Sequence, residues 1–184
     1  MHEVSLNQVI TDYLTGQEIT LTTYEDIRQA LARILVEEKG YPVSAIESKY
    51  CLDLDLGNES YQVILDFVIY YNQKPLIVLG FCPGAVSTYI TQYVSLCRVF
   101  PQGPVPYTLV TDSKDAALIR TRDKKDLCRG FRCIPAWEDL ESLSEDDVYY
   151  TLPEERLEKE KRVVYAMFAL SDGCCTAKCP KPTD

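Results

Sequence analysis

Two apolar segments joined by a short polar turn place the strongest constraint on how this chain folds. Residues 61–71 and 76–79 are rich in Val, Ile, Leu and aromatic side chains, and the residues from Asn72 to Pro75 between them are typical of a turn. Runs this apolar and β-branched are typical of strands that are covered on both faces. We therefore expect these two segments to be the central strands of a sheet.

Hydrophobic spacing on either side of these segments predicts helices and further strands. Residues 24–39 place apolar side chains at helical intervals, Thr22 and Glu25 have the spacing of a capping box, and Gly40 ends the helix. The other predicted elements are a strand over 50–56 before a turn at 57–58, a helix over 86–100, strands over 107–111 and 116–119, and a last helix over 154–171. The expected fold class is α/β, with the sheet and its helices in residues 1–150 and a C-terminal helix and Cys-rich tail in residues 151–184.

Composition supports one acidic globular domain. The chain has 184 residues, of which 46% are hydrophobic, so it is long enough to cover one core. Lys and Arg total 19 against 28 Asp and Glu, which gives a formal net charge of -9. Because this charge repels a phosphate backbone, a general nucleic-acid coat protein is disfavoured.

Three further observations bear on location and chemistry. The N-terminal residues lack the basic region and apolar stretch of a signal peptide, and no apolar run is long enough to span a bilayer. We therefore expect a cytoplasmic protein with no membrane partner, in which most of the eight cysteines are reduced. The single histidine, His2, leaves little material for Ser-His, Cys-His or His-rich metal sites.

Several short segments together resemble a known family. They are Tyr24 to Gln29, Gly40 to Pro42, residues 65–70, residues 74–78 and Pro83-Gly84. In this order and spacing they resemble the N-terminal domain of type I restriction enzyme R subunits, over residues 24–119 with a weaker match at Ile134-Pro135.

The resemblance implies a PD-(D/E)XK nuclease-like fold, which is a restriction-endonuclease-like mixed central sheet flanked by helices. In active members an aspartate on the second central strand and a Glu-x-Lys on the third hold Mg²⁺ and position the attacking water. Asp66 matches the aspartate position, and Glu25 lies on the helix where some relatives place an accessory acid. Glu25 and Asp66 are therefore the candidate catalytic residues.

The remaining catalytic positions are not matched. The Glu-x-Lys position falls on Gly80-Phe81-Cys82 or on Leu79-Gly80-Phe81, depending on the anchor used. No Asp or Glu lies between Asp66 and Asp112, and no Lys lies between Lys74 and Lys114. The helix after these strands offers only Arg98, a poor replacement because guanidinium does not give up a proton.

Each candidate acid also has a structural interpretation. The preferred interpretation of Glu25 is a capping-box residue, and that of Asp66 is a strand carboxylate that binds neighbouring backbone or Arg28.

A locally basic stretch is the candidate nucleic-acid site. Residues 120–132 carry six positive and two negative side chains, whereas residues 138–147 carry six negative ones. The positive residues are Arg120, Arg122, Lys124, Lys125, Arg129 and Arg132. The alternatives are a solvated loop, or pairing with the acidic stretch in the same or another copy of the chain.

Three cysteines near the C-terminus form a candidate zinc site. Cys174, Cys175 and Cys179 supply three thiols, and a fourth ligand would come from Cys128 or Cys133. The alternative is a reduced, disordered tail. Cys51, Cys82 and Cys97 are expected to be small buried hydrophobes.

Taken together, these patterns lead to one expected function and two alternatives. The expected protein is a stand-alone, catalytically inactive relative of the restriction-subunit domain that binds nucleic acid or protein, with homo-oligomers left open. The first alternative is a Mg²⁺-dependent DNA endonuclease with non-standard ligands. The second is an interaction or scaffold protein that uses its C-terminal helix.

Overall fold

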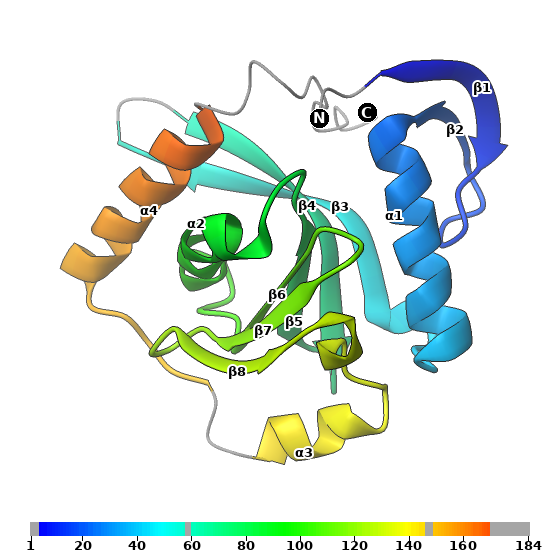
Figure 1. Ribbon diagram of the computed structural model, residues 1–184. Helices are drawn as coiled ribbons and strands as arrows, with labels where there is room; N and C mark the ends of the chain where they lie inside the picture. The colour runs from blue at the N-terminus through cyan, green and yellow to red at the C-terminus, as the bar shows by residue number, and fades with distance from the viewer. Residues whose placement is uncertain (1–3, 58–59, 146–148, 170–184) are drawn as a thin grey trace.

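A mixed six-stranded sheet forms the centre of the protein (Figure 1). The computed structural model describes residues 4–57, 60–145 and 149–169. The strands lie in chain order across the sheet, with bounds β3 Ile46–Asp55, β4 Ser60–Tyr71, β5 Lys74–Phe81, β6 Tyr107–Thr111, β7 Ala116–Arg120 and β8 Lys125–Arg129. Neighbours pair antiparallel except β5 and β6, which are parallel because the helix α2, Val86–Arg98, crosses between them. The predicted fold class, a mixed sheet flanked by helices, is confirmed.

The two apolar segments are interior strands, as predicted. They form β4 and β5, and their buried residues include Phe67, Ile69, Ile77 and Leu79, each fully covered. The polar turn between them contains Asn72 and Gln73 at positive φ, which lets the two strands reverse direction tightly.

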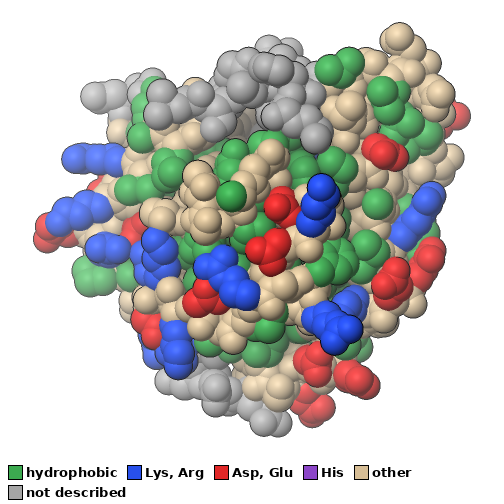
Figure 2. All heavy atoms as spheres, viewed as in Figure 1, with side chains coloured by type: hydrophobic (Ala, Val, Ile, Leu, Met, Phe, Trp, Pro, Cys, Tyr) green, Lys and Arg blue, Asp and Glu red, His purple; other side chains and the backbone are tan. Residues whose placement is uncertain are grey.

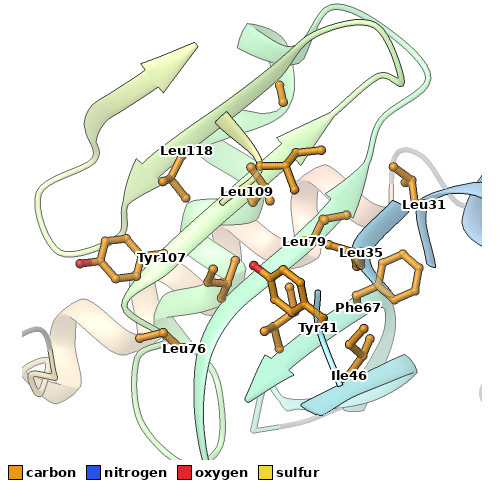
Figure 3. Packing of buried hydrophobic residues seen from close by; sticks show 14 of the residues in the cluster. Leu31, Leu35, Tyr41, Ile46, Phe67, Leu76, Leu79, Tyr107, Leu109 and Leu118 are labelled. Atoms are coloured by element: carbon orange, nitrogen blue, oxygen red, sulfur yellow. The ribbon is translucent and has the colours of Figure 1, made fainter. Parts of the chain in front are cut away.

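Helix α1, Thr23–Arg33, covers one face of the sheet and begins where the sequence indicated. The Oγ1 atom of Thr22 accepts a hydrogen bond from the Glu25 amide at 3.0 Å. The helix continues as a π-helical turn, Ile34–Glu38, and Gly40 follows with a φ of 74°. Its apolar side, with Leu31 and Leu35, packs on side chains from the sheet, as Figure 3 shows.

Helices α2 and α4, Glu154–Ala169, lie on the opposite face of the sheet (Figure 1). Val164 of α4 is buried, and Leu157 and Phe168 pack against the core between these helices and the sheet. Because this apolar side of α4 is already covered, these side chains do not form a free docking face for a scaffold partner. A short helix α3, Asp139–Glu145, and 3-10 turns at Val43–Ala45 and Phe131–Cys133 complete the described elements.

Three strands were not predicted from the sequence. Strands β1, Ser5–Thr11, and β2, Glu18–Thr22, form a separate two-stranded antiparallel sheet beside α1. Strand β8 lies within the basic stretch, for which a solvated loop was one alternative, and all five of its residues are exposed. Strands with so little buried surface lack the alternating apolar pattern that reveals a half-buried strand.

The expectation that most cysteines are reduced is wrong for a pair that joins β8 to the 3-10 turn after it. Cys128 and Cys133 form a disulfide, with their Cα atoms 5.6 Å apart. Cys51 is also disulfide-bonded and only partly buried, so it is not the small buried hydrophobe that we expected. Cys82 and Cys97 are buried free thiols, as predicted. Burial raises the pKa of Cys82 to about 11.

In the part of the chain that the structure describes, no helix is long and apolar enough to cross a membrane.

Candidate functional site

At Asp66 the odd-numbered side chains of β4 change from one side of the sheet to the other. Val63 and Leu65, before it, pack toward α2 and α4, whereas Phe67 and Ile69, after it, pack toward α1. All four positions have the same parity, and a regular strand would place them on one face. The strand therefore twists sharply at Asp66.

The neighbouring strand β3 distorts at the matching position. Ser48 pairs with Phe67 and Tyr50 with Leu65, so the register places Lys49 opposite Asp66. Lys49 has a φ of 54°, which is uncommon for a residue with a side chain. This distortion lies beside α1, and the Lys49 ammonium contacts a carboxylate of that helix.

Arg28 on α1 bridges the two candidate catalytic acids. Its Nε and Nη2 atoms donate to Oδ1 of Asp66 at 3.2 and 2.9 Å, and its Nη1 atom donates to Oε2 of Glu25 at 2.7 Å. The other carboxylate oxygen of Asp66, Oδ2, accepts from the Phe81 amide at 2.8 Å. The structure therefore brings Glu25 and Asp66 together, with a guanidinium between them.

Two further side chains complete the set of contacts around Glu25. The Nζ atom of Lys49 lies 2.6 Å from Oε2 of Glu25, and Nε2 of Gln29 donates to Oε1 at 2.9 Å. Gln29 also donates to Oδ2 of Asp12 at 2.8 Å, which ties the β1–β2 hairpin to α1. The Glu25 carboxylate thus contacts Arg28, Lys49 and Gln29. Glu25 takes part in the N-terminal cap of α1 through its backbone amide.

Burial makes these charges interdependent. The side chains of Arg28, Glu25 and Asp66 are 10%, 5% and 13% exposed. Burial alone would lower the pKa of Arg28, but the charges of Asp66 and Glu25 outweigh it and raise that pKa above its ordinary value. Arg28 is therefore a fixed cation that neutralises the acids next to it.

The position predicted for a second acidic ligand is filled by an aromatic ring. A Cβ atom on Gly80 would lie 2.1 Å from Cε1 of Tyr93, because the ring of Tyr93 rests directly on this glycine. The Tyr93 hydroxyl donates to the Phe81 carbonyl at 3.0 Å, which holds the ring in place. In the other alignment the acid falls on Leu79, which is fully buried in the core beneath α1. Neither alignment leaves room for a carboxylate.

Comparison with known proteins gives one match. The sequence model for the N terminus of the type I restriction enzyme R protein matches residues 23–135. The chain belongs to this family. No match is found among curated proteins or among solved structures. The matched residues run from the start of α1 to just beyond the disulfide, so they contain Glu25, Arg28, Lys49 and Asp66 and leave the β1–β2 hairpin outside.

A metal site in the described part of this restriction-subunit family member would need a group of metal-ligating side chains. Among the described residues, no three His, Cys, Asp or Glu side chains gather in a way that would hold a metal ion. Cys174, Cys175 and Cys179 lie outside the described residues. Cys128 and Cys133 are bonded to each other, so the expectation that one of them is a fourth zinc ligand is wrong for this state of the protein.

The basic residues predicted to contact nucleic acid lie at the end of β7, in the turn that joins β7 to β8, along β8 and in the turn after it, and most have partners of their own. Arg120 pairs with Asp123 at 2.6 Å, and Arg129 pairs with Asp126. The Nζ atom of Lys124 donates to the Thr91 hydroxyl at 2.6 Å. The Arg122 guanidinium lies 5.1 Å from the centre of the Tyr150 ring. Lys125 and Arg132 are exposed.

Figure 2 shows positive and negative side chains interspersed across the visible face of the molecule rather than one continuous basic surface. The short-range pairs of Arg120 and Arg129 with acids three residues away account for part of this mixing. The basic stretch is therefore less positive in space than its sequence suggests.

Sequence reasoning identified Asp66, Glu25 and the contact between Asp66 and Arg28, but it missed Lys49. A signal for Lys49 was present. A turn at residues 57–58 sets a register in which residue 49 faces residue 66, because Asp55 pairs with Ser60. Gln29 and Asp12 carried no such signal, since the hairpin that contains Asp12 was itself not predicted.

Proposed function

We propose that this chain is a non-catalytic member of the restriction-subunit family, with a PD-(D/E)XK-like fold, that acts by binding another macromolecule. The observation that carries this proposal is the position of Arg28 between Glu25 and Asp66. In an active nuclease of this type the acids hold Mg²⁺, and here a protein cation makes direct contacts with both of them.

The chemistry of Mg²⁺ supports the proposal. The ion needs several oxygen ligands in near-octahedral geometry, and two-carboxylate sites supply the anionic part. One oxygen of Asp66 is occupied by Arg28 and the other by the Phe81 amide. The Tyr93 ring occupies the space over Gly80, where one alignment places the second ligand. Two anionic ligands are therefore not free at the same time.

One observation favours a second candidate, a Mg²⁺-dependent DNA endonuclease with non-standard ligands. The fold gathers two acids and a lysine, Glu25, Asp66 and Lys49, although the sequence lacks the Glu-x-Lys motif. A lysine in such a site orients water or stabilises developing negative charge. For this chemistry to occur, Arg28 would have to leave the position between the acids.

A cleavage assay separates the two candidates. Purified protein should leave single- and double-stranded DNA intact with either Mg²⁺ or Mn²⁺, because Arg28 neutralises the acids. The assay compares the wild type with Asp66→Ala. The matched control is Asp53→Ala, which removes an exposed acid on β3 outside the candidate site. Metal-dependent cleavage that is lost in Asp66→Ala and retained in Asp53→Ala would establish the endonuclease instead.

The charge distribution favours a protein over a nucleic acid as the bound macromolecule. The chain has a net charge of -9, and Arg120 and Arg129 are engaged by neighbouring acids. Phosphate contacts gain affinity chiefly by releasing counterions, which requires several unpaired cations on one surface.

Fluorescence anisotropy with labelled DNA and RNA tests this preference. We expect weak binding at low salt that disappears at about 150 mM salt and in the triple variant Arg122→Glu, Lys124→Glu, Lys125→Glu. Arg162→Glu on α4, outside the basic stretch, serves as the charge-reversal control. Binding that persists at the higher salt would make nucleic acid the partner.

A further inference from the structure

Strand β1 presents an exposed apolar surface. Val4, immediately before the strand, is 55% exposed, and Leu6 and Val9 within it are 44% and 67% exposed. They make up most of the large hydrophobic side chains that lie exposed in the described residues. Hydrophobic side chains are visible over β1 at the upper right of Figure 2. Single exposed apolar residues are common on proteins, but a group of them on one strand marks an interaction surface.

The backbone of β1 is also open to pairing on its outer side. The Asp12 amide donates to the Gln17 carbonyl at 2.7 Å, and Ile10 pairs with Ile19 in the same register. Hydrogen-bonded pairs alternate along an antiparallel ladder, so Val9 and Thr11 direct their N–H and C=O groups away from β2. Among the described strands only β2 pairs with β1, so these groups form an edge that another strand can join.

The charge of β1 distinguishes it from the other edge strands of the described sheets. Its sequence, SLNQVIT, contains no charged residue. Strand β3 carries Glu47, Lys49, Asp53 and Asp55, strand β8 carries Lys125, Asp126 and Arg129, and strand β2 carries Glu18. Charges on an edge strand oppose pairing with a second chain, and β1 lacks this protection.

The size of the β1–β2 sheet favours an added strand. Two-stranded sheets are marginally stable in water, and a third or fourth strand increases both the hydrogen bonding and the buried apolar area. Six of the seven residues of β1, all except Ile10, are exposed, so the described residues leave much of this sheet uncovered. The hairpin is held to α1 mainly through contacts such as that between Asp12 and Gln29.

We propose that β1 pairs antiparallel with β1 of a second copy of this chain, about a twofold axis, to form a four-stranded sheet. An antiparallel pair of identical strands is self-complementary, because each copy offers the donors and acceptors that the other needs. Asn7, at a φ of 54° and next to an irregularity in the β1–β2 register, confines the regular pairing to residues 8–11. Strand β1 lies outside the residues that match the family. The proposed dimer does not depend on whether the site at Asp66 is catalytic.

Charge selects this occupant. Two copies that each carry a net charge of -9 repel one another, so their contact is most favourable where an uncharged strand meets an uncharged strand. The acid of β2, Glu18, lies opposite Thr11 and is one further strand away from the second copy. That separation is about 10 Å, similar to the Debye length in physiological salt, so its repulsion is largely screened.

Sedimentation velocity over a concentration series tests the proposal with the full chain. The wild type should sediment as a dimer that dissociates on dilution. Val9→Lys should weaken dimerisation by about tenfold or more, because twofold symmetry places the substituted side chain at the contact twice. Val43→Lys replaces a valine that is 42% exposed on the 3-10 turn before β3, and it should leave the dimer unchanged.

Two results would overturn the proposal: a wild-type monomer at all soluble concentrations, or a Val9→Lys dimer as strong as that of the wild type. Circular dichroism and thermal melting check that Val9→Lys is folded. If it is not, hydrogen exchange on the wild type decides the question. The amides of Val9 and Thr11 should be protected at high protein concentration and exchange faster on dilution, and exchange that does not depend on concentration would contradict the proposal.

Discussion

Replacing Arg28 with Met is expected to lower the free energy of unfolding by about 3–5 kcal/mol at neutral pH. The guanidinium makes direct contacts with Glu25 and Asp66, and all three side chains are nearly buried. Removing it leaves two carboxylates close together, with Lys49 as the remaining ion-pair partner of Glu25 among the described residues. Urea denaturation followed by circular dichroism gives the change.

Two variants make this result specific to the ion pairs. The first is Arg33→Met on the same helix. Arg33 is exposed, and its described contact is with the Tyr13 ring, so this substitution should lower the free energy of unfolding by less than about 1 kcal/mol. Adding Glu25→Gln and Asp66→Asn to Arg28→Met should restore much of the stability, because no unpaired charge then remains buried. An unfolding free energy that is unchanged in Arg28→Met would show that Arg28 does not neutralise these acids.

Replacing Arg98 with Met is expected to cost about 3 kcal/mol of unfolding free energy, for a related reason on the other face of the sheet. Arg98 on α2 donates to Oε1 of Glu160 on α4 at 2.8 Å and to the carbonyls of Thr121 and Arg122 at 3.1 Å each. Its side chain is 10% exposed and that of Glu160 is 4% exposed. The substitution leaves buried acceptors without their donor and weakens the contact between α2 and α4.

A second arginine of Glu160 provides the matched control for this prediction. Arg156 lies 2.7 Å from the same oxygen of Glu160, but its side chain is 54% exposed. Arg156→Met should therefore cost about 0.5 kcal/mol. Equal losses in Arg98→Met and Arg156→Met would contradict the argument from burial.

The Arg98 effect should also depend on pH. Burial acts to raise the pKa of Glu160, but the hydrogen bond from Ser95 and the charges of Arg98 and Arg156 outweigh it and lower that pKa below its ordinary value of 4.5. Because the pKa of Glu160 is lower in the folded state than in the unfolded state, its ionised form stabilises the fold at pH values above the unfolded-state pKa. This stabilisation is lost as the pH falls through the folded-state pKa. The difference between wild type and Arg98→Met should thus shrink below about pH 4.5.

The core elements of this protein were accessible from local patterns in the chain. Strands β4 and β5, helix α1 with its Thr22 cap, helix α2 and helix α4 all bury one side or both, and burial imposes a period on the sequence. Membership of the restriction-subunit family followed from short motifs in a fixed order, and the family comparison confirms it. The same motifs located Asp66. Its structural interpretation named neighbouring backbone or Arg28 as the partner, and the structure has both contacts.

Tertiary structure decided the rest, because the remaining features have no local signature. The β1–β2 hairpin and β8 are largely exposed, so no hydrophobic period marks them. The disulfide depends on how the chain turns after β8, and the mixture of charges around the basic stretch depends on which side chains meet in space. The ion pair between Arg28 and Asp66 joins residues 38 positions apart, and that between Lys49 and Glu25 joins α1 to β3. Side chains from α1, β3 and β4 together decide whether Glu25 and Asp66 can bind a metal ion or are paired with an arginine. The pattern of residues along any one of these elements does not contain that information.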